Sequence, residues 1–454
     1  MKRMIGERQV DQAALFYEFS LERHVPAEHM LRAIDGLVDL EGVRAHLVTF
    51  YSPTGRPSVP PELLIRMLIV GYCFGIRSER QLCQEVHLNL AYRWFCRLGL
   101  DGDVPDHSTF SKNRHGRFRD SDVLRHVFET VLRSCMAEGL VGGEGFAVDA
   151  SLIKADANRQ SGVQHVEALT SVQSRRAVRE YLSVLDDAAF GAATTVPPKY
   201  IAPVDPAARW TAANGGLAFF AYSTNYLIDL DNAVIVDVEA SSAIRQAEVT
   251  AAKTMIARAR QRFDLHPERL AADTAYGSAE MLDWLANKQN IAPHVPVFDK
   301  SQRIDGTFSR DDFAYIHDRD VYVCPGGKDL TTSGTRVNDG TTLLYRATKS
   351  DCSACALKVR CSPNTPMRRV PRSIHEGARD LARNIAKTAG YLTSRRQRKK
   401  VEMCFAHLKR ILNLDRLRLR GPCGAHDEFL LAATAHNLRK LAKLIPATVA
   451  LPAT

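Results

Sequence analysis

The chain has 454 residues, of which 61 are Lys or Arg and 51 are Asp or Glu, so its net charge is +10 and its pI is near 9.1. This length exceeds what one hydrophobic core organises, which excludes a single small domain and predicts two or three structural units. The positive charge is clustered and suits a polyanionic partner. The clusters are Arg395, Arg396, Arg398, Lys399 and Lys400, then Arg416, Arg418 and Arg420, then Arg439, Lys440 and Lys443.

Export, membrane insertion and a disulfide framework are not expected. Met1 to Phe16 carries charges throughout and has no apolar signal-peptide stretch. The most apolar window, Leu63 to Ile76, contains Arg66 and is shorter than the roughly 20 residues of a membrane helix, so it is predicted to be a core helix. Several of the ten cysteines stand singly in helical patterns, where a free thiol behaves as a small apolar group. A cytoplasmic protein with no membrane contact is expected.

Residues 1–140 are expected to form an all-helical domain. Ser78 to Gln81 fits a capping box, and the helix that follows is predicted to run toward Gly99. A further helix starts within Asp106 to Arg114, and the tight turns between short helices predict a helix-turn-helix-like DNA-binding module. A plain helical bundle used for dimerisation explains the pattern equally well. The candidate DNA contacts on the last helix are Lys112 and Arg114.

After Gly142 to Gly145 the pattern changes from helices to strands, so a catalytic α/β domain is predicted to begin near residue 141. Its first part spans residues 141–300 and includes a polar insertion at 156–215. Alternating strands and helices toward its end predict parallel strand pairing. The predicted strands are 146–153, 217–230, 233–238, 270–276 and 291–298, and the predicted helices are 245–260 and 278–288.

Two aspartates follow the apolar runs of predicted strands, and at the second the strand gives way to a loop. Asp149 follows the apolar run Gly145 to Val148, and Asp273 follows Leu270 to Ala272. Side chains at the carboxyl ends of parallel strands meet in the crevice that binds ligands in α/β sheets. Each aspartate by itself is explained as a strand-end or helix-capping residue. Asp156 is a reserve candidate, whereas Glu248 and the other nearby acids are expected to be solvated.

Residues 301–370 are expected to form a small β-rich insertion with little core of its own. It contains four cysteines, three of them in a CxxC pair followed by a third thiol. Four thiolates suit tetrahedral Zn²⁺. A redox-sensitive pair and unligated core cysteines are the alternatives. The four residues are Cys324, Cys352, Cys355 and Cys361.

The C-terminal part, residues 371–454, contains a predicted helix that carries a glutamate among basic residues. Val401, Phe405, Leu408 and Leu412 recur on one helical face and predict packing on a core. Arg398, Glu402 and Lys409 fall on an adjacent stripe, where the carboxylate can bind a cation and the cations can grip phosphates. An ordinary surface salt bridge is the alternative interpretation.

Three carboxylates in one pocket repel one another unless cations lie between them, which is the physical reason to predict metal. Hard oxygen ligands favour Mg²⁺ or Mn²⁺. Such ions polarise a phosphodiester, activate a water or 3′-hydroxyl nucleophile and stabilise the leaving oxygen. Asp149, Asp273 and Glu402 therefore predict metal-dependent phosphoryl transfer on DNA.

These residues also resemble a known family. Over nearly its whole length the chain resembles the bacterial insertion-sequence transposases of the DDE type, which have a helical N-terminal domain and a ribonuclease H-like catalytic core. The resembling segments are Arg56 to Leu64, Pro105 to Phe110, Val148 to Ala150, Asp205 to Arg209, Asp273 to Gly277 and the spacing Arg398-x3-Glu402-x6-Lys409.

The resemblance implies specific roles. Asp149, Asp273 and Glu402 would be the metal-binding triad, and Tyr276, Arg398 and Lys409 would hold the strand of the transposon end. Members of the family often carry a tyrosine three positions before the arginine, where this chain has Arg395. Arg395 is therefore a candidate DNA contact at which the chain departs from the pattern.

The fold expected is α/β: a ribonuclease H-like mixed sheet flanked by helices, preceded by an all-α domain and interrupted by the β-rich insertion. The function expected is cleavage and strand transfer of double-stranded DNA at the terminal inverted repeats of an insertion sequence, in a homo-oligomer that holds element ends and target. A domesticated nuclease without joining activity and a non-catalytic DNA-binding protein are the alternatives.

Overall fold

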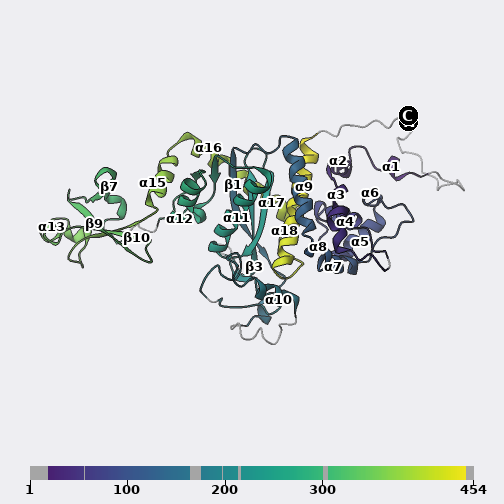
Figure 1. Ribbon diagram of the computed structural model, residues 1–454, viewed down its shortest axis with the longest axis horizontal. Helices are drawn as coiled ribbons and strands as arrows, with labels where there is room; N and C mark the ends of the chain where they lie inside the picture. Colours follow the sequence, from purple (N-terminus) through teal and green to yellow (C-terminus); the bar gives the residue numbers. More distant parts are fainter. Residues whose placement is uncertain are drawn as a thin grey trace, which may run out of the picture. The chain divides into compact units, whose positions relative to one another are not determined.

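The computed structural model describes residues 19–55, 57–163, 175–196, 198–212, 216–299 and 305–445. The chain divides into two compact units, residues 1–131 with 434–454 and residues 132–433. The first unit is helical, and the second combines two sheets with helices (Figure 1). The fold class predicted from the sequence is confirmed.

The N-terminal unit consists of short helices around an apolar centre. The helix α4 contributes Leu64, Ile65 and Leu68, which are buried, so the most apolar window is a core helix as predicted. No helix among the described residues combines the length and apolarity needed to cross a membrane. The helices are α1 (Leu21–His24), α2 (Met30–Leu37), α3 (Glu41–Leu47), η1 (Val48–Phe50), α4 (Pro61–Cys73), α5 (Glu79–Leu88), α6 (Leu90–Phe95), α7 (His107–Arg114), α8 (Arg117–Asp120) and the start of α9 (Val123–Ala137).

The helix predicted to run from Ser78 toward Gly99 is divided in two. Ser78 caps α5 by accepting a hydrogen bond from the backbone N–H of Gln81, which is one half of the predicted capping box. Asn89 then ends this helix and starts α6, because its side-chain oxygen accepts hydrogen bonds from the N–H groups of Ala91 and Tyr92. An amide side chain that caps a new helix thus overrides the continuous apolar pattern.

The second unit is built on a six-stranded sheet with the order β2-β3-β1-β5-β6, in which β4 also pairs with β3. The pairs β1–β3 and β3–β4 are antiparallel, whereas β1–β5 and β5–β6 are parallel. An antiparallel meander that continues into parallel strands is the ribonuclease H-like arrangement predicted. The strands are β1 (Gly145–Lys154), β2 (Arg209–Thr211), β3 (Phe219–Asp229), β4 (Ile235–Ser242), β5 (Arg269–Ala271) and β6 (Ala292–His294).

Helices cover both faces of this sheet. Ser223 of β3 faces α11 (Arg245–Phe263), where it donates a hydrogen bond to Glu248. Tyr226 of the same strand meets Phe405 of α17 (Lys399–Arg410), with ring centroids 5.5 Å apart. Positions 223 and 226 lie on opposite faces because side chains alternate along a strand. The two helices therefore pack on opposite sides of the sheet.

The remaining elements of this unit are short helices and the C-terminal helices. The polar insertion contributes η2 (Arg159–Ser161) and α10 (Arg176–Ser183), and β5 is followed by η4 (Thr274–Tyr276), α12 (Ala279–Asp283) and the π-helical turn η5 (Trp284–Lys288). The C-terminal helices are α15 (Glu376–Ile385), α16 (Ala389–Gln397), α17 and α18 (Pro422–Leu444). Val401, Leu408 and Leu412 are buried, which confirms the predicted apolar face.

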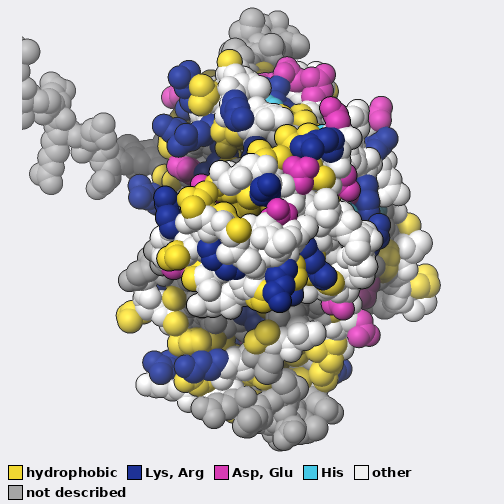
Figure 2. Space-filling model, turned by 90° about the vertical axis from the view of Figure 1, so that its left-hand side faces the viewer, with side chains coloured by type: hydrophobic (Ala, Val, Ile, Leu, Met, Phe, Trp, Pro, Cys, Tyr) yellow, Lys and Arg dark blue, Asp and Glu magenta, His cyan; other side chains and the backbone are white. Residues whose placement is uncertain are grey.

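The cysteine-bearing insertion forms a separate antiparallel sheet with the order β11-β10-β9-β8-β7. The expectation that it has little core is wrong, because Phe313, Tyr322, Leu330, Tyr345 and Val370 pack into a hydrophobic cluster. Figure 2, seen from the side where Figure 1 draws this sheet, shows Lys and Arg side chains dispersed among hydrophobic ones. Its elements are η6 (Arg310–Asp312), β7 (Ala314–Ile316), η7 (His317–Arg319), β8 (Val321–Val323), β9 (Asp329–Val337), β10 (Thr342–Arg346), α13 (Lys349–Ser353), α14 (Lys358–Cys361) and β11 (Arg369–Ser373).

Candidate active site

Asp149 and Asp273 occupy equivalent positions on neighbouring parallel strands. The pairing of β1 with β5 ends at Ala147 opposite Ala271, and each aspartate follows two residues later. Neighbouring strands lie about 4.8 Å apart, so this register brings the two residues close together at the carboxyl edge of the sheet. Asp273 also caps the turn η4, because its Oδ1 accepts a hydrogen bond from Ala275 N–H at 2.7 Å. That cap is why the strand predicted for 270–276 ends early.

The environment of Asp149 disfavours its negative charge. The pKa of this carboxyl is raised to about 6, first by burial and then by the charges of Asp273 and Glu248. A hydrogen bond from Ala150 N–H and the charge of Arg398 act in the opposite direction. A carboxylate kept in such a place needs a positive partner to remain ionised.

Glu248 is a third carboxylate at this edge, and the sequence interpretation missed it. Its side chain is partly buried in the first helical turns of α11, where Oε1 accepts a hydrogen bond from Ser223 Oγ at 2.6 Å. Burial, followed by the charge of Asp273, raises the pKa of Glu248. The sequence held no local signal for it, because the placement follows from strand direction: β1 and β4 are both antiparallel to β3, so the helix after β4 starts at the edge where β1 ends. We call Asp149, Asp273 and Glu248 the edge cluster.

Arg398 links the edge cluster to Glu402. Its Nη1 lies 3.3 Å from Asp149 Oδ2, and its Nη2 lies 3.8 Å from Glu402 Oε1. The carboxylates of Asp149 and Glu402 are thus separated by one guanidinium group. They differ in exposure, because the side chain of Glu402 is 67% exposed and that of Asp149 is 19% exposed.

The helix α17 that carries Glu402 is anchored to the sheet by two lysines. Lys400 Nζ donates hydrogen bonds to the carbonyls of Leu230 and Asp231, both at 2.7 Å. Lys409 Nζ donates to the carbonyl of Leu152 in β1 at 3.1 Å, and burial lowers the pKa of this lysine. In this structure Lys409 therefore holds the strand that carries Asp149.

The other candidate DNA contacts differ in accessibility. Lys112 and Arg395 are exposed. Arg114 is buried and forms an ion pair with Glu79 at 2.5 Å, so a phosphate contact would have to replace that pair. Tyr276 is 1% exposed, and its hydroxyl lies among the edge cluster, whose three charges help burial to raise its pKa well above the usual value. Its predicted contact with the transposon end stays a prediction.

The edge cluster fits a hard divalent cation by the chemistry of its donors. All three are carboxylates, and the buried hydroxyl of Tyr276 beside them has no hydrogen-bond partner in the part of the chain that the structure describes. In the described ranges, no three His, Cys, Asp or Glu side chains stand in an arrangement that already holds a metal ion. Coordination by three of these groups would therefore need side-chain rotation.

The four cysteines of the insertion are free thiols, and two of them lie beside the same glycine. A Cβ atom at Gly326 would lie 3.6 Å from Cys355 Sγ and 3.7 Å from Cys324 Sγ, so these two sulfurs flank the same glycine. Burial raises the pKa of Cys361, and Cys352 and Cys324 add to the effect. Cys324 Sγ also accepts the N–H of Lys328 at 3.4 Å within a tight turn. Zinc binding at this place stays a prediction.

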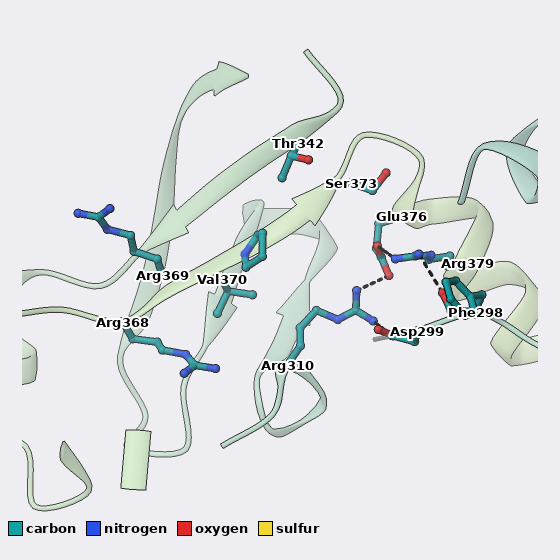
Figure 3. Close-up of a pocket in the computed structure, with 11 residues that line it drawn as sticks. Phe298, Asp299, Arg310, Thr342, Arg368, Arg369, Val370, Ser373, Glu376 and Arg379 are labelled. Atoms are coloured by element: carbon teal, nitrogen blue, oxygen red, sulfur yellow. Dashed lines mark hydrogen bonds and ion pairs between the residues drawn. The ribbon is translucent and has the colours of Figure 1, made fainter. Parts of the chain in front are cut away.

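A second acidic group lies where the insertion sheet joins α15, beside a cavity of about 480 Å³ (Figure 3). Glu376, which is 1% exposed, forms ion pairs with Arg310, Arg379 and Arg383 at 2.8, 3.1 and 3.0 Å. Asp299 pairs with Arg310 and Arg383. We call these five residues the junction cluster. Both carboxylates of the junction cluster are neutralised by arginines, as is expected of residues that connect two structural elements.

Comparison with protein families indicates the class of protein to which this sheet belongs, because a transposase domain of the DDE type supports an enzyme of the polynucleotidyl transferase type. Residues 19–116 match the Transposase domain (DUF772), and residues 323–442 match the Transposase DDE domain. The second match contains Arg398, Glu402 and Lys409, whereas Asp149 and Asp273 lie between the two matched stretches. The two matches support an insertion-sequence transposase of the DDE type.

Proposed function

We propose that this chain cleaves and joins DNA at the terminal inverted repeats of its insertion sequence, using Asp149, Asp273 and Glu402 with Mg²⁺ or Mn²⁺. The observation that carries the proposal is the register of β1 and β5, whose last pair, Ala147 with Ala271, lies two residues before each aspartate. The ion pairs of Arg398 with Asp149 and Glu402 support the assignment of Glu402 as the third acid.

The residues of the chain have separate tasks in this scheme. Asp149 and Asp273 would hold divalent ions, which supply charge stabilisation and nucleophile activation at the phosphodiester when bound. Glu402, being exposed, can approach from the DNA side. Arg398 neutralises Asp149 and, with exposed Arg395, offers guanidinium groups to the phosphate backbone. Lys409 keeps β1 in place through the Leu152 carbonyl.

The test is incubation of the full chain with labelled double-stranded element ends, with Mg²⁺ or with EDTA. We expect nicking at the repeat boundary that depends on the metal, and joining of pre-cut ends to a target duplex. Cleavage without joining would support the nuclease alternative. DNA binding with neither reaction would support a non-catalytic protein. Because two ends must be held together, we further propose a homo-oligomer on DNA, acting in the cytoplasm and tested by light scattering of the complex.

We also propose that Cys324, Cys352, Cys355 and Cys361 bind a structural Zn²⁺. The proximity of two sulfurs to Gly326 and the mutual influence of Cys361, Cys352 and Cys324 support it. Elemental analysis of the purified chain should give one zinc per chain, lost in Cys352→Ser. A metal-free chain with unchanged unfolding temperature in that variant would favour unligated core thiols.

A further inference from the structure

The first turns of α11 are fixed against the turn that carries Asp273. Arg245 donates hydrogen bonds from Nε to the carbonyl of Ala275 at 2.8 Å and from Nη2 to the carbonyl of Thr274 at 2.7 Å. Glu248 follows Arg245 by three residues, which places it on the same side of the helix. The position of Glu248 beside Asp273 is therefore set by backbone contacts and does not depend on the rotamer of one side chain.

Strand direction brings Asp149 to the same place. Both β1 and β4 run opposite to β3, and β5 runs parallel to β1, so β1, β4 and β5 all end at one edge of the sheet. Asp149 lies within β1, two residues beyond the part that pairs with β5, Asp273 follows β5, and Glu248 lies at the start of the helix after β4. The edge cluster thus collects one carboxylate from each of three neighbouring segments.

The surroundings of the edge cluster leave its charge uncompensated. Glu248 Oε1 accepts the hydrogen bond from Ser223, whereas Oε2 accepts none among the described residues. Arg398 pairs with Asp149, and Arg245 is engaged with backbone carbonyls. Tyr276 Oη is buried, lies within electrostatic range of all three carboxylates, and has no hydrogen-bond partner among the described residues. A buried hydroxyl of this kind beside three acids suits a further polar ligand, such as the hydration shell of a cation.

We propose that Glu248 is a ligand of the divalent ions held by Asp149 and Asp273, a fourth acidic residue beyond the triad of Asp149, Asp273 and Glu402. The role of Glu248 in a reaction rests on the proposed function. Metal binding by Glu248 is argued from the edge cluster alone. Glu248 lies in the buried part of the site, and Glu402 is exposed. Glu248 would therefore hold the ion in the free protein, whereas Glu402 would complete the site when DNA is bound.

The test is a titration of the full chain with Mn²⁺ alone, followed by electron paramagnetic resonance, which reports bound ions without any reaction. Glu248→Gln keeps the hydrogen bond from Ser223 and removes the charge, so Mn²⁺ affinity should fall at least about tenfold. Glu280→Gln, on the exposed face of α12, is the matched control and should bind Mn²⁺ as the wild type does. Glu402→Gln should have a smaller effect than Glu248→Gln when DNA is absent.

Two further variants separate a ligand from a structural residue. Ser223→Ala removes the hydrogen bond to Glu248 and keeps all the carboxylates, so Mn²⁺ affinity should change less than about threefold. Glu248→Asp keeps the charge and should bind Mn²⁺ more tightly than Glu248→Gln does. Equal losses in Ser223→Ala and Glu248→Gln, unchanged Mn²⁺ affinity in Glu248→Gln, or no Mn²⁺ binding by the wild type at millimolar concentrations would each overturn the proposal.

Cleavage measured in parallel distinguishes this inference from the proposed function. If the wild type binds Mn²⁺ through Glu248 and never cleaves element ends, the proposed reaction fails and the ligand assignment holds. If the wild type cleaves, Glu248→Gln should raise the Mg²⁺ concentration for half-maximal cleavage by about tenfold or more. Cleavage by Glu248→Gln with the Mg²⁺ dependence of the wild type would overturn the ligand assignment and leave the transposase proposal intact.

Discussion

The edge cluster and the junction cluster are two groups of acids in the same unit with opposite electrostatics. In the junction cluster, Glu376 and Asp299 share three arginines, so each negative charge is matched. In the edge cluster, three carboxylates have one arginine, Arg398, in direct ion-pair contact. Burial and mutual repulsion then raise the pKa of Asp149 to about 6. The paired charges of the junction cluster therefore suit a structural role, whereas the excess negative charge of the edge cluster suits the binding of a cation.

The largest difference between the two clusters should appear in catalysis. We expect Asp149→Asn and Asp273→Asn each to reduce Mg²⁺-dependent cleavage of element ends by at least about 1000-fold. Each variant loses a ligand of the metal ions that would stabilise the transition-state charge. The same variants should keep or raise the unfolding temperature, since each removes repulsion inside the edge cluster. Cleavage is read on labelled duplexes, and unfolding by circular dichroism.

Glu402→Gln should abolish cleavage in the same way while DNA binding stays nearly intact. Asp318→Asn, an exposed residue of the insertion, serves as the control and should cleave as the wild type does. Wild-type cleavage by any one of the three triad variants would remove that residue from the proposed triad. Loss of stability in Asp149→Asn would instead show that the edge cluster is structural, like the junction cluster.

Substitution in the junction cluster should lower the stability of the protein. Glu376→Gln leaves Arg310, Arg379 and Arg383 buried or half-buried without their shared anion, which should cost about 3–5 kcal/mol of unfolding free energy. Chemical denaturation followed by fluorescence measures this cost, and Glu280→Gln is the surface control. A loss below about 1 kcal/mol would mean that the matched charges contribute little to the joint.

Sequence patterns predicted the long elements of the catalytic unit and placed Asp149 and Asp273 after apolar runs of predicted strands, although Asp149 lies in the middle of β1. Apolar alternation and helical spacing gave β1, β3, β4 and α11 to within a few residues. They failed at β5 and β6, which are only three residues each, because side-chain caps such as Asp273 end short strands. Long regular segments carry a periodic signal that three-residue strands lack.

Partnerships between distant residues were beyond those patterns. Glu248 has the spacing of a solvated helix position, and only the direction of β4 relative to β1 brings it to the acidic edge. Arg114 has the spacing of an exposed helix residue, and the ion pair with Glu79 buries it. In both cases the surroundings of the residue depend on a segment distant in the sequence, which helical or strand periodicity does not identify.

Asp205 is a third kind of acid, buried without a cation in direct contact. Tyr222 donates a hydrogen bond to it, and burial raises its pKa from 3.8 to about 7. Because the folded state then binds a proton that the unfolded state has released, the contribution of this residue to stability falls as pH rises from about 4 to about 7. Asp205→Asn should remove on the order of 3 kcal/mol of that fall.

The measurement for Asp205 is the unfolding free energy at a series of pH values between 4 and 7 in wild type and variant. The two curves should diverge in favour of Asp205→Asn as pH rises, whereas Asp318→Asn should follow the wild type. Parallel curves would show that Asp205 is ionised in the folded protein, with a charge compensated as in the junction cluster.

The smallest expected effect concerns Arg398, the cation that stands between the edge cluster and Glu402. Arg398→Ala should weaken binding to element ends by about tenfold, near 1.4 kcal/mol, and reduce the salt dependence of binding by about one counterion. Lys409→Ala should act differently, because Lys409 Nζ donates a hydrogen bond to the Leu152 carbonyl. The stability of this variant should fall, and the salt dependence of its DNA binding should equal that of the wild type. Exposed Lys387 gives the control substitution to Ala. If the salt dependence of DNA binding is the same in Arg398→Ala and the wild type, Arg398 pairs with Asp149 and does not contact DNA phosphates.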